Sequence, residues 1–485
     1  MILKELLEGL TYEVVNGNLN VNVEKIVHNS SDVTAGSAFI AIPGYKVDGH
    51  NYITTAISKG AIAIILEEEP KEYLDNITYI KIEDTRMGLS KIANNFYEFP
   101  SSKLKVIGIT GTNGKTSTSL MVKSLLEASG KKVGIIGTIG SFMGQEKREL
   151  KNTTPDSLEL QEILNSMVSH SIEYVIMEVS SHALQLNRVM GIEFDHGVFT
   201  NLTQDHLDFH GNMDEYFRQK QKLFNMTSGY NILNNDDSYG KILRNNLEKE
   251  NKKVLRFGLD DSAEIYATDI VYSINGVDFT LCMHGERIKI HCPIPGKFTV
   301  YNLLAAIAIA LLEGVGLETI ATAIEKIPTV PGRIEKMEIN RPFDVIIDFA
   351  HTPDGLENVI LSLRDHVKGR LITLFGCGGD RDKAKRPIMG KIAGELSDYC
   401  IITSDNPRSE DPERIIQDVV KGVKTTKCPY TAITDRKEAI EFALKMAKEN
   451  DVILLAGKGH ETDQILKDKV IEFNEKNIVK ELLGE

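Results

Sequence analysis

Residues 105–120 read KVIGITGTNGKTSTSL, and this stretch decides the expected fold. An apolar run suited to a buried strand leads into a glycine-rich loop, and a segment of helical character follows. Glycines let a loop turn its backbone amides toward phosphate oxygens, while the Lys115 ammonium can neutralise outer phosphates and the Thr116 hydroxyl can ligate Mg²⁺. The stretch therefore predicts a nucleoside triphosphate site in an α/β fold.

The loop departs from the common pattern G-x-x-x-x-G-K-[ST], because Ile109 stands where that pattern has its first glycine. The spacing is instead G-x-x-G-T-N-G-K-T, beginning at Gly108. A glycine-rich turn with an incidental lysine is the plainer interpretation. The strand, the loop, Lys115, Thr116 and the helix nevertheless occur in the right order, which favours nucleotide binding.

Around this loop, short apolar runs alternate with segments of helical periodicity. KVGIIG, YVIMEVS, HGVFTN and YNILN are typical of strands, so we expect a mostly parallel sheet covered by helices. Residues 264–292 differ, because their Asn-Gly and His-Gly pairs predict turns of an antiparallel appendage. After VPGR (residues 330–333) the alternation resumes with FDVIIDFA, RLITLFG, DYCIITS and VILLAG, which predicts a second α/β domain.

The length of 485 residues is too great for one ordinary core and suggests about three domains. A polar break at Phe99-Pro100-Ser101-Ser102 precedes the strand KVIGIT and marks the first boundary. We expect a smaller N-terminal α/β domain over residues 1–100 and a central P-loop-type domain with a mostly parallel sheet over residues 101–331. A Rossmann-like α/β domain is expected over residues 332–485.

The composition excludes several classes of protein. Lys+Arg 56 against Asp+Glu 69 gives a formal charge of -13, which argues against nucleic-acid binding through phosphate neutralisation. The five scattered cysteines favour neither a disulfide framework nor a zinc site. The N-terminus MILKELLEGL is typical of an amphipathic helix rather than a secretory signal, and no apolar run reaches membrane-spanning length. We therefore expect a cytoplasmic protein without membrane insertion.

Two further polar clusters follow predicted strands, at the sheet edge where α/β proteins bind ligands. One begins with Glu178 and the other contains Asp205 and His206 within DHLDFH. A helix cap or a solvated charge would explain Glu178 alone, and a satisfied structural histidine would explain His206 alone. The density of His and Asp in DHLDFH favours a functional interpretation.

The motifs GTNGKTS, MEVSSH, NLTQDHLDFHG and YFRQKQKLF together resemble the Mur ligases, the ATP-dependent amide-bond ligases of bacterial cell-wall synthesis. The resemblance runs through nearly the whole chain and includes HNSSDVTAGSAFIAIPGYKVDGH, NTTP, GKFTVYN, VPGRIEKM, DFAHTPDG, GCGGDRDKAKRP, SDNPRSEDP and GKGHE. It is similar to the members that join meso-diaminopimelate to UDP-N-acetylmuramoyl-L-alanyl-D-glutamate. The resemblance thus implies that reaction, in a protein expected to be monomeric.

The resemblance also implies roles for residues around ATP and Mg²⁺. The catalytic residues would be Lys115, Glu178, His206 and Lys220. The Mg²⁺ ligands would be Thr116, Glu178, His206 and Lys220, and Lys220 would be carbamylated (N6-carboxylysine). The ATP-binding residues would be Gly111, Thr112, Asn113, Gly114, Lys115, Thr116, Ser117, Asn302, Arg333 and Asp348. A carbamate oxygen suits a hard cation. Without the family, Lys220 would be interpreted as a solvated helix lysine beside Lys222.

Two substrate sites follow from the same resemblance. The diaminopimelate site would comprise Arg381, Asp405, Asn406, Pro407, Arg408, Gly457 and Glu461, because a guanidinium can hold the carboxylate that lysine lacks. The UDP-sugar peptide would contact Ser30, Thr153, Thr154, Ser180 and Arg188. The chain departs from the family pattern where Asn29 and Ser31 flank Ser30, and where Leu186 replaces a glutamine of some relatives.

Three other functions stay open from the sequence. A lysine-adding ligase would use the same scaffold. A folylpolyglutamate synthetase shares the phosphate loop and the glutamyl-amide chemistry but should lack the N-terminal domain. A regulatory P-loop NTPase would hydrolyse ATP without either substrate.

Overall fold

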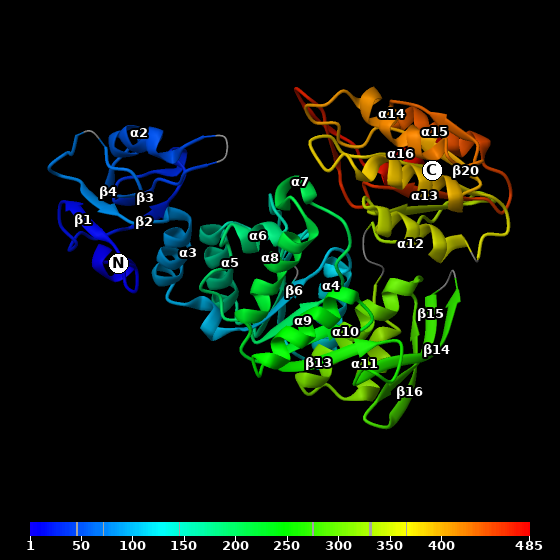
Figure 1. Ribbon diagram of the computed structural model, residues 1–485, viewed down its shortest axis with the longest axis horizontal. Coiled ribbons are helices and arrows are strands. Elements are labelled where there is room, and N and C mark those ends of the chain that lie inside the picture. Colours follow the sequence, from blue (N-terminus) through cyan, green and yellow to red (C-terminus); the bar gives the residue numbers. More distant parts are fainter. Residues whose placement is uncertain (45–46, 71, 145, 274–275, 329–331, 365) are drawn as a thin grey trace. The chain divides into compact units, whose positions relative to one another are not determined.

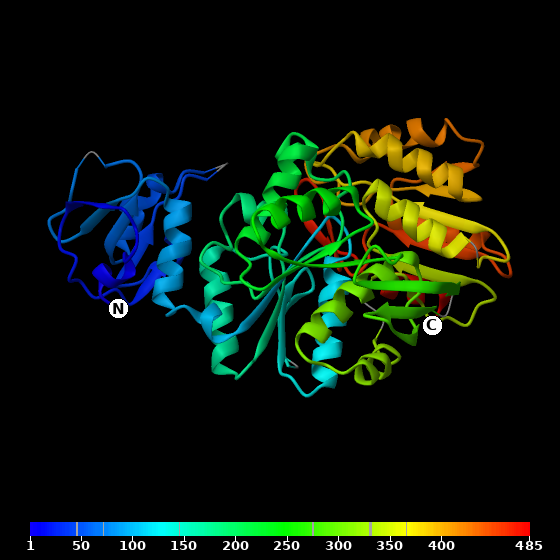
Figure 2. The same ribbon diagram turned by 60° about the horizontal axis from the view of Figure 1, so that its bottom comes forward.

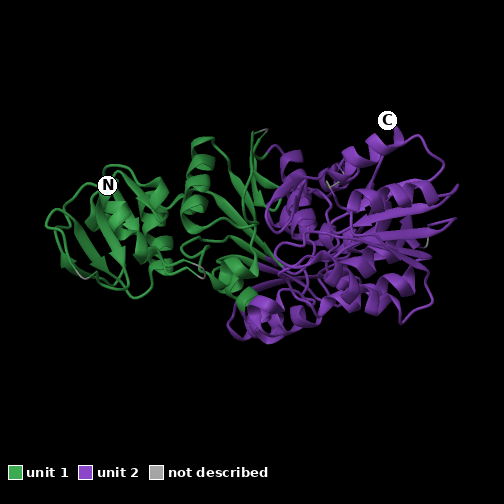
Figure 3. Cartoon of the chain, turned by 90° about the horizontal axis from the view of Figure 1, so that it is seen from above, with its two compact units in different colours: residues 1–110, 131–197, 219–230 green, residues 111–130, 198–218, 231–485 purple. Residues whose placement is uncertain are grey.

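The computed structural model describes residues 1–44, 47–70, 72–144, 146–273, 276–328, 332–364 and 366–485 (Figure 1). The chain forms two compact units, which Figure 3 colours separately. The first unit contains residues 1–110, 131–197 and 219–230, and the second contains residues 111–130, 198–218 and 231–485. Outside the described residues lie Tyr45 and Lys46 of the N-terminal motif, Asn275 of the expected Asn-Gly turn, and Val330 and Pro331 of VPGR.

The first part of the first unit is a five-stranded sheet with helices on both faces. Its elements are α1 (Leu3–Leu6), β1 (Glu13–Asn16), β2 (Lys25–Val27), β3 (Ser37–Ile40), α2 (Ile53–Ser58), β4 (Ala61–Leu66), β5 (Thr78–Lys81) and α3 (Thr85–Phe96). The strand order is β1-β5-β4-β3-β2, and only β1 runs antiparallel to its neighbour. Successive strand side chains alternate between an apolar cluster under α1 and α3 and another under α2. Only four residues of the expected N-terminal helix are helical, so the helix is shorter than its periodicity suggests.

The remainder of the first unit carries the strand that precedes the phosphate loop. Its elements are β6 (Lys105–Thr110), β7 (Val133–Gly137), β8 (Gly140–Met143), β9 (Glu146–Arg148), α5 (Ser157–Ser169), β10 (Tyr174–Glu178) and α6 (Ser181–Gln185). Strand β10 lies between β6 and β7 and is parallel to both, while β8 and β9 extend the sheet in antiparallel fashion. The strands predicted at KVIGIT, KVGIIG and YVIMEVS are confirmed. Strand β11 (His196–Phe199), helix α8 (Met213–Asn225) and strand β12 (Tyr230–Asn234) carry the chain between the units.

The second unit begins with the helix that follows the phosphate loop. Its first elements are α4 (Lys115–Ala128), α7 (Leu207–His210), α9 (Ser238–Lys249), β13 (Lys253–Gly258), β14 (Ile265–Ser273), β15 (Gly276–Met283), β16 (Glu286–Cys292), α10 (Lys297–Leu312) and α11 (Leu317–Ile324). Helix α10 packs on α4 and is buried on nearly every side, which matches its almost wholly apolar sequence. Strands β14, β15 and β16 form the expected antiparallel appendage. His284 and Gly285 both have positive φ (47° and 85°), as a tight hairpin turn requires.

The C-terminal part of the second unit is a sheet between two helical layers, drawn in yellow to red in Figures 1 and 2. Its elements are β17 (Glu335–Lys336), β18 (Asp344–Asp348), α12 (Pro353–Arg364), β19 (Leu371–Phe375), α13 (Lys385–Leu396), β20 (Tyr399–Ile402), α14 (Pro412–Val423), β21 (Tyr430–Ala432), α15 (Arg436–Met446), β22 (Val452–Ala456), β23 (Asp463–Ile465), β24 (Val470–Glu472) and α16 (Glu475–Leu483). The strand order is β17-β18-β22-β19-β20-β21, parallel except for β17. One apolar cluster lies under α12, α13 and α14, and the other under α15 and α16.

The predicted α/β class is confirmed, because the N-terminal and C-terminal sheets are mainly parallel and both are covered by helices. In parallel sheets the loops at the carboxyl ends of the strands gather on one edge, so the loops after β18, β19, β20 and β22 meet there. Within the described part of the chain, no helix combines the length and apolar character that crossing a membrane requires.

Candidate active site

The phosphate loop is held by residues that follow strand β11. Asn201 and Asn113 bond reciprocally: the Asn113 amide donates to Asn201 Oδ1 (2.9 Å), and Asn201 Nδ2 donates to the Asn113 carbonyl (3.1 Å). The Thr200 hydroxyl donates to the same carbonyl at 2.6 Å, and the Thr112 amide donates to the Asn201 carbonyl at 2.9 Å. Thr200 and Asn201 therefore fix the shape of the loop.

Lys115 and Gly114 show why the loop needs these residue types. Lys115 Nζ donates to the carbonyls of Gly111 (2.9 Å) and Thr112 (3.0 Å), so the ammonium lies over the loop. Gly114 has a φ of 88°, and a Cβ on it would lie 2.4 Å from Oδ1 of Asn302. Glycine is thus required both by the backbone conformation and by the close approach of Asn302.

A pocket beside the loop gathers several of the predicted nucleotide residues. Its lining includes apolar side chains of the second unit together with the predicted Asn113, Gly114, Ser117, Asn302, Arg333 and Asp348. Asn113 Nδ2 donates to Asp354 Oδ2 at 2.9 Å, which connects the loop to helix α12. The Arg333 guanidinium lies 4.8 Å from the centre of the Phe349 ring. The Asp348 carboxylate accepts from the backbone amides of Ile334 and Ala350, both at 2.7 Å, and burial raises its pKa although Arg333 opposes the rise.

In the first unit, Glu178 ends strand β10 beside the residues predicted to bind the nucleotide sugar. Its fully buried carboxylate accepts from the backbone amide and the hydroxyl of Thr138, at 3.0 and 3.1 Å. The Thr154 hydroxyl donates to the Glu178 carbonyl (2.8 Å) and accepts from the Ser180 amide (3.0 Å). Arg188 Nη1 donates to the Thr154 carbonyl at 2.9 Å. The structure thus gathers Thr154, Ser180 and Arg188, and Thr153 joins them through Thr138 (3.1 Å between the hydroxyls).

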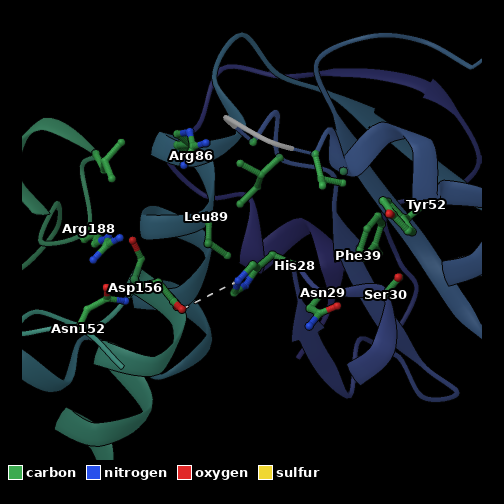
Figure 4. Close-up of a pocket in the computed structure, with 16 residues that line it drawn as sticks. His28, Asn29, Ser30, Phe39, Tyr52, Arg86, Leu89, Asn152, Asp156 and Arg188 are labelled. Carbon is green, nitrogen blue, oxygen red and sulfur yellow. Dashed lines mark ion pairs between the residues drawn. The ribbon is translucent and has the colours of Figure 1, made fainter. Parts of the chain in front are cut away.

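A pocket of about 590 Å³ opens beside these residues in the same unit, and Ser30 is one of the residues that line it (Figure 4). Figure 4 shows Arg86 of α3 and Arg188 at this pocket, together with the His28–Asp156 ion pair (3.9 Å). Burial lowers the pKa of Arg188, Asp156 opposes that shift, and the neighbouring positive charge of Arg86 adds to it. Two guanidinium groups close enough to influence each other in a cavity of this size suit an anionic ligand.

The histidine cluster centres on Asp205, which is buried. Its carboxylate lies 3.3 Å from His206 Nε2, 3.6 Å from Lys385 Nζ and 3.9 Å from His351 Nε2. Burial opposes ionisation of Asp205, but the charges of His206, Lys385 and His351 hold its pKa well below the ordinary value. His206 has a φ of 54°, an uncommon backbone conformation for a non-glycine residue and one often found at functional sites.

The residues expected at Mg²⁺ are distributed over both units, and their donor chemistry suits a hard cation. The Thr116 hydroxyl and the Glu178 carboxylate supply buried oxygen donors, and Lys220, only 1% exposed on α8, would add oxygens as a carbamate. Among the described residues, no three His, Cys, Asp or Glu side chains form a metal cluster by themselves.

The residues predicted to bind the amino acid lie together where the loops after β19, β20 and β22 meet. Asn406 Nδ2 donates to Glu461 Oε2 at 2.9 Å, and the Asp405 carbonyl accepts from Gln464 Nε2 at 2.7 Å. A Cβ on Gly457 would lie 2.8 Å from Asp405 Oδ2, so these two loops approach each other too closely for a larger residue. Residues separated by about fifty positions in the sequence thus share one site.

Two arginines lie side by side at this site. A Cβ on Gly378 would lie 2.9 Å from Arg408 Nη1 and 3.7 Å from Arg381 Cγ. Arg408 donates to the carbonyl of Gly379 at 2.9 Å and, like His206, has a left-handed backbone (φ 51°). Burial and then the charge of Arg381 lower the pKa of Arg408, and nearby carboxylates oppose the shift. Pro407 belongs to the same turn, since its carbonyl accepts from the Glu410 amide at 3.0 Å.

Several residues at these sites were not predicted from the sequence. Lys385, His351 and Asp354 belong to quoted motifs, but their contacts depend on chain segments far away in the sequence. Arg86 stands in the first turn of α3, where the helix dipole disfavours a cation. That unfavourable position was a usable signal of a second role for Arg86.

Comparisons with known proteins agree with this arrangement. Residues 22–97, 109–310 and 332–459 match models described as the Mur ligase family, catalytic domain, the Mur ligase middle domain, and the Mur ligase, glutamate ligase domain. A Clostridium acetobutylicum protein named UDP-N-acetylmuramoyl-L-alanyl-D-glutamate--2,6-diaminopimelate ligase 1 is 49% identical, with 100% of both chains covered. A Caldanaerobacter subterraneus protein named as such a ligase is 48% identical and covers 100% of this chain and 99% of its own.

Solved structures extend the comparison. A structure of a UDP-N-acetylmuramoyl-L-alanyl-D-glutamate--2,6-diaminopimelate ligase has a TM-score of 0.70 at 29% identity, with 100% of this chain and 99% of that chain covered. A folylpolyglutamate synthase from Mycobacterium tuberculosis shares the fold, with a TM-score of 0.65 at 16% identity and 83% and 95% coverage. Given the domain models and the relatives that match over the full length, the chain belongs to the Mur ligase family.

Proposed function

We propose that this chain catalyses the ATP-dependent addition of meso-2,6-diaminopimelate to UDP-N-acetylmuramoyl-L-alanyl-D-glutamate, an amide-forming step of peptidoglycan precursor synthesis. The relatives named for this reaction support the proposal. The observation that carries it is the pair Arg381 and Arg408 beside Glu461, because diaminopimelate has carboxylates for the arginines and ammonium groups for an acid.

Discrimination against lysine follows from the same pair. Lysine would leave a guanidinium without its carboxylate, and an unpaired buried charged group costs more than a lost methylene. The deciding experiment measures ATP-dependent phosphate release with the nucleotide substrate and either diaminopimelate or lysine. We expect turnover with diaminopimelate, and equal or faster turnover with lysine would favour the lysine-adding alternative.

The proposed chemistry activates a carboxylate that would not react with an amine by itself. The ATP γ-phosphoryl group passes to the side-chain carboxylate of the D-glutamyl residue, which gives an acyl phosphate and ADP. The diaminopimelate amine then attacks the acyl carbon, and the tetrahedral intermediate expels phosphate. Lys115 would offset the charge that develops during phosphoryl transfer.

We assign the predicted residues to these steps. Gly111, Thr112, Asn113, Gly114, Ser117, Asn302, Arg333 and Asp348 would hold ATP, and Thr116, Glu178, His206 and the carbamate of Lys220 would hold Mg²⁺. Mg²⁺ bound there would supply neutralisation of the phosphate charge. We propose that residues 1–100, 101–331 and 332–485 form the domains that bind the nucleotide sugar, ATP and the amino acid. The enzyme would be cytoplasmic and would act as a monomer.

The pocket of the first unit is the proposed site of the uridine diphosphate moiety. Arg86 and Arg188 can pair with its phosphate charges, and Ser30, Thr153, Thr154 and Ser180 provide hydroxyl groups at or near the pocket. Asn29 and Ser31 stand where the family has an acid and an arginine, so this chain lacks the guanidinium of that arginine. Arg86 supplies a guanidinium at the pocket instead.

Arg86→Ala is expected to raise KM for the nucleotide substrate about 10- to 100-fold, because a charge-assisted contact worth about 1.5 to 3 kcal/mol is lost. KM for ATP should be unchanged. Initial-rate kinetics with each substrate varied in turn provides the measurement. The matched control is Lys91→Ala, an exposed residue of the same helix α3. An unchanged KM for the nucleotide substrate in Arg86→Ala would remove Arg86 from the site.

Lys220→Ala is expected to reduce kcat by at least about 10- to 100-fold, because the loss of a group that only supports a metal ligand already has an effect of that size. Because the missing group is a carboxylate on a buried side chain, formate or acetate should restore part of the rate. Lys222→Ala on the same helix is the control and should show neither the loss nor the rescue. A folded Lys220→Ala enzyme that small carboxylates do not rescue would count against the carbamate.

Two remaining alternatives are separated by substrate dependence. A regulatory NTPase would release phosphate from ATP alone, whereas the proposed ligase requires both other substrates. A folylpolyglutamate synthetase would accept a folate in place of the muramoyl nucleotide. Residues 1–97, which form a sheet of their own and contribute to the pocket of Arg86, favour the nucleotide-sugar substrate.

A further inference from the structure

Lys458, in the segment GKGHE after strand β22, is a buried cation that has no role in the proposed reaction steps. Its side chain is 0% exposed, so it cannot touch a substrate in this conformation. Lysine is among the residues least often fully buried, because a desolvated ammonium is costly unless it is paired. The partners of Lys458 are therefore informative.

Those partners are two residues of the proposed amino-acid site. Lys458 Nζ donates to Glu461 Oε2 at 2.9 Å and to Asn406 Oδ1 at 3.3 Å. Asn406 Nδ2 also donates to Glu461 Oε2, at 2.9 Å, so the three side chains form a closed triangle. The ammonium additionally lies 5.9 Å from the centre of the buried Phe473 ring, within the range of a cation–π interaction.

The triangle determines which Glu461 oxygen can meet a ligand. Both donors end on Oε2, and Oε1 accepts no hydrogen bond from the described part of the chain. The Glu461 side chain is 33% exposed, in contrast to Lys458. The Asn406 amide is itself fixed, because the Ile465 backbone amide donates to its Oδ1 at 2.9 Å. Lys458 and Asn406 thus hold Glu461 Oε2, which leaves Oε1 for a ligand.

We propose that Lys458 is a positioning residue, whose buried ammonium holds Glu461 and Asn406 so that Glu461 Oε1 receives an ammonium group of the incoming diamino acid. The inference rests on the proposed function and adds a specificity device to it. Lys458 also offsets the charge of Glu461 while the site holds no amino acid, which lets a carboxylate stay ordered between loops. Lys458 neither gives up nor takes up a proton in the reaction, and it forms no covalent bond.

The test uses the full-length enzyme with Lys458→Met, which keeps the length of the side chain, and Lys458→Gln, which keeps a donor and removes the charge. We expect KM for diaminopimelate to rise about tenfold or more in both, as for the loss of a buried charged partner, while KM for ATP stays at the wild-type value. If Lys458→Met does not fold, Lys458→Gln carries the comparison. A KM for diaminopimelate that is unchanged or lower would overturn the proposal.

A double-mutant cycle with Glu461→Gln separates positioning from simple stabilisation of the fold. If Lys458 acts through Glu461, then Lys458→Met in the Glu461→Gln background should raise KM for diaminopimelate little further. Additive effects would overturn the proposal. Lys437→Met, which removes an exposed ion pair with Glu481 in the same part of the chain, is the matched control. A wild-type enzyme inactive with diaminopimelate would refute the proposed function instead, so the two failures are distinguishable.

Discussion

Lys115→Ala is expected to abolish ATP-dependent ligation and to leave the fold intact. The Lys115 ammonium lies on the phosphate loop, 2.9 Å from the Gly111 carbonyl and 3.0 Å from the Thr112 carbonyl. Alanine removes the positive charge that would stabilise the transferring phosphoryl group, so the rate should fall about 1000-fold or more. The measurement is phosphate release with ATP, the muramoyl dipeptide nucleotide and diaminopimelate all present.

The control for this prediction lies on the same helix. Lys123 pairs with Glu127 at 2.6 Å on the outer face of α4, so Lys123→Ala should retain the wild-type rate. Thermal unfolding midpoints of Lys115→Ala and wild type should agree, since Lys115 contributes little to the core. Wild-type turnover by Lys115→Ala would refute the assignment of the phosphate loop and, with it, the activation step.

Arg408→Ala is expected to damage the use of diaminopimelate specifically. Arg408 is held by the Gly379 carbonyl beside Arg381, and loss of one partner of a buried charge pair typically costs about 2 to 5 kcal/mol. We therefore expect kcat/KM for diaminopimelate to fall between about 30-fold and several thousandfold. The preference over lysine should shrink as well, because lysine makes no use of the lost guanidinium. Steady-state kinetics with both amino acids measures the two effects.

Arg408→Lys tests the geometry of the contact rather than its charge. A lysine ammonium is a point charge and cannot reproduce the planar fork that holds two carboxylate oxygens, so most of the loss should remain. Arg414→Ala is the matched control, since its side chain is 88% exposed on neighbouring helix α14. Retention of wild-type diaminopimelate KM by Arg408→Ala would place the distal carboxylate elsewhere.

Much of the fold could be predicted from local pattern alone. Strands β18, β19, β20 and β22 are continuous apolar runs, because helices cover both faces of their parallel sheet. Strands β6 and β10 are buried over nearly their whole length and are mostly apolar too. Short edge strands gave no comparable signal. β17 and β21 have two and three residues and lie at the two edges of the C-terminal sheet, where half-exposed side chains carry little periodicity.

The candidate site was predictable only in part. Lys115 and Thr116 follow from the loop itself, since their chemistry is local to the strand, turn and helix. The contacts among Asn406, Lys458 and Glu461 do not, because two loops about fifty residues apart come together only after the sheet has formed. Arg86 was missed for a related reason: its neighbours at the pocket, such as Arg188, lie about a hundred positions away.

The hydrogen bond between Asn113 and Asp354 has a consequence for recombination among relatives. It joins the loop after β6 to the first turn of α12, across 241 positions of the sequence. A chimera that takes its C-terminal third from another family member keeps this bond if that member also has an aspartate at the position of Asp354, which lies in the motif DFAHTPDG. Because such a hydrogen bond contributes about 0.5 to 1.5 kcal/mol, exchanged segments keep this contribution only when positions 113 and 354 still supply an amide and a carboxylate.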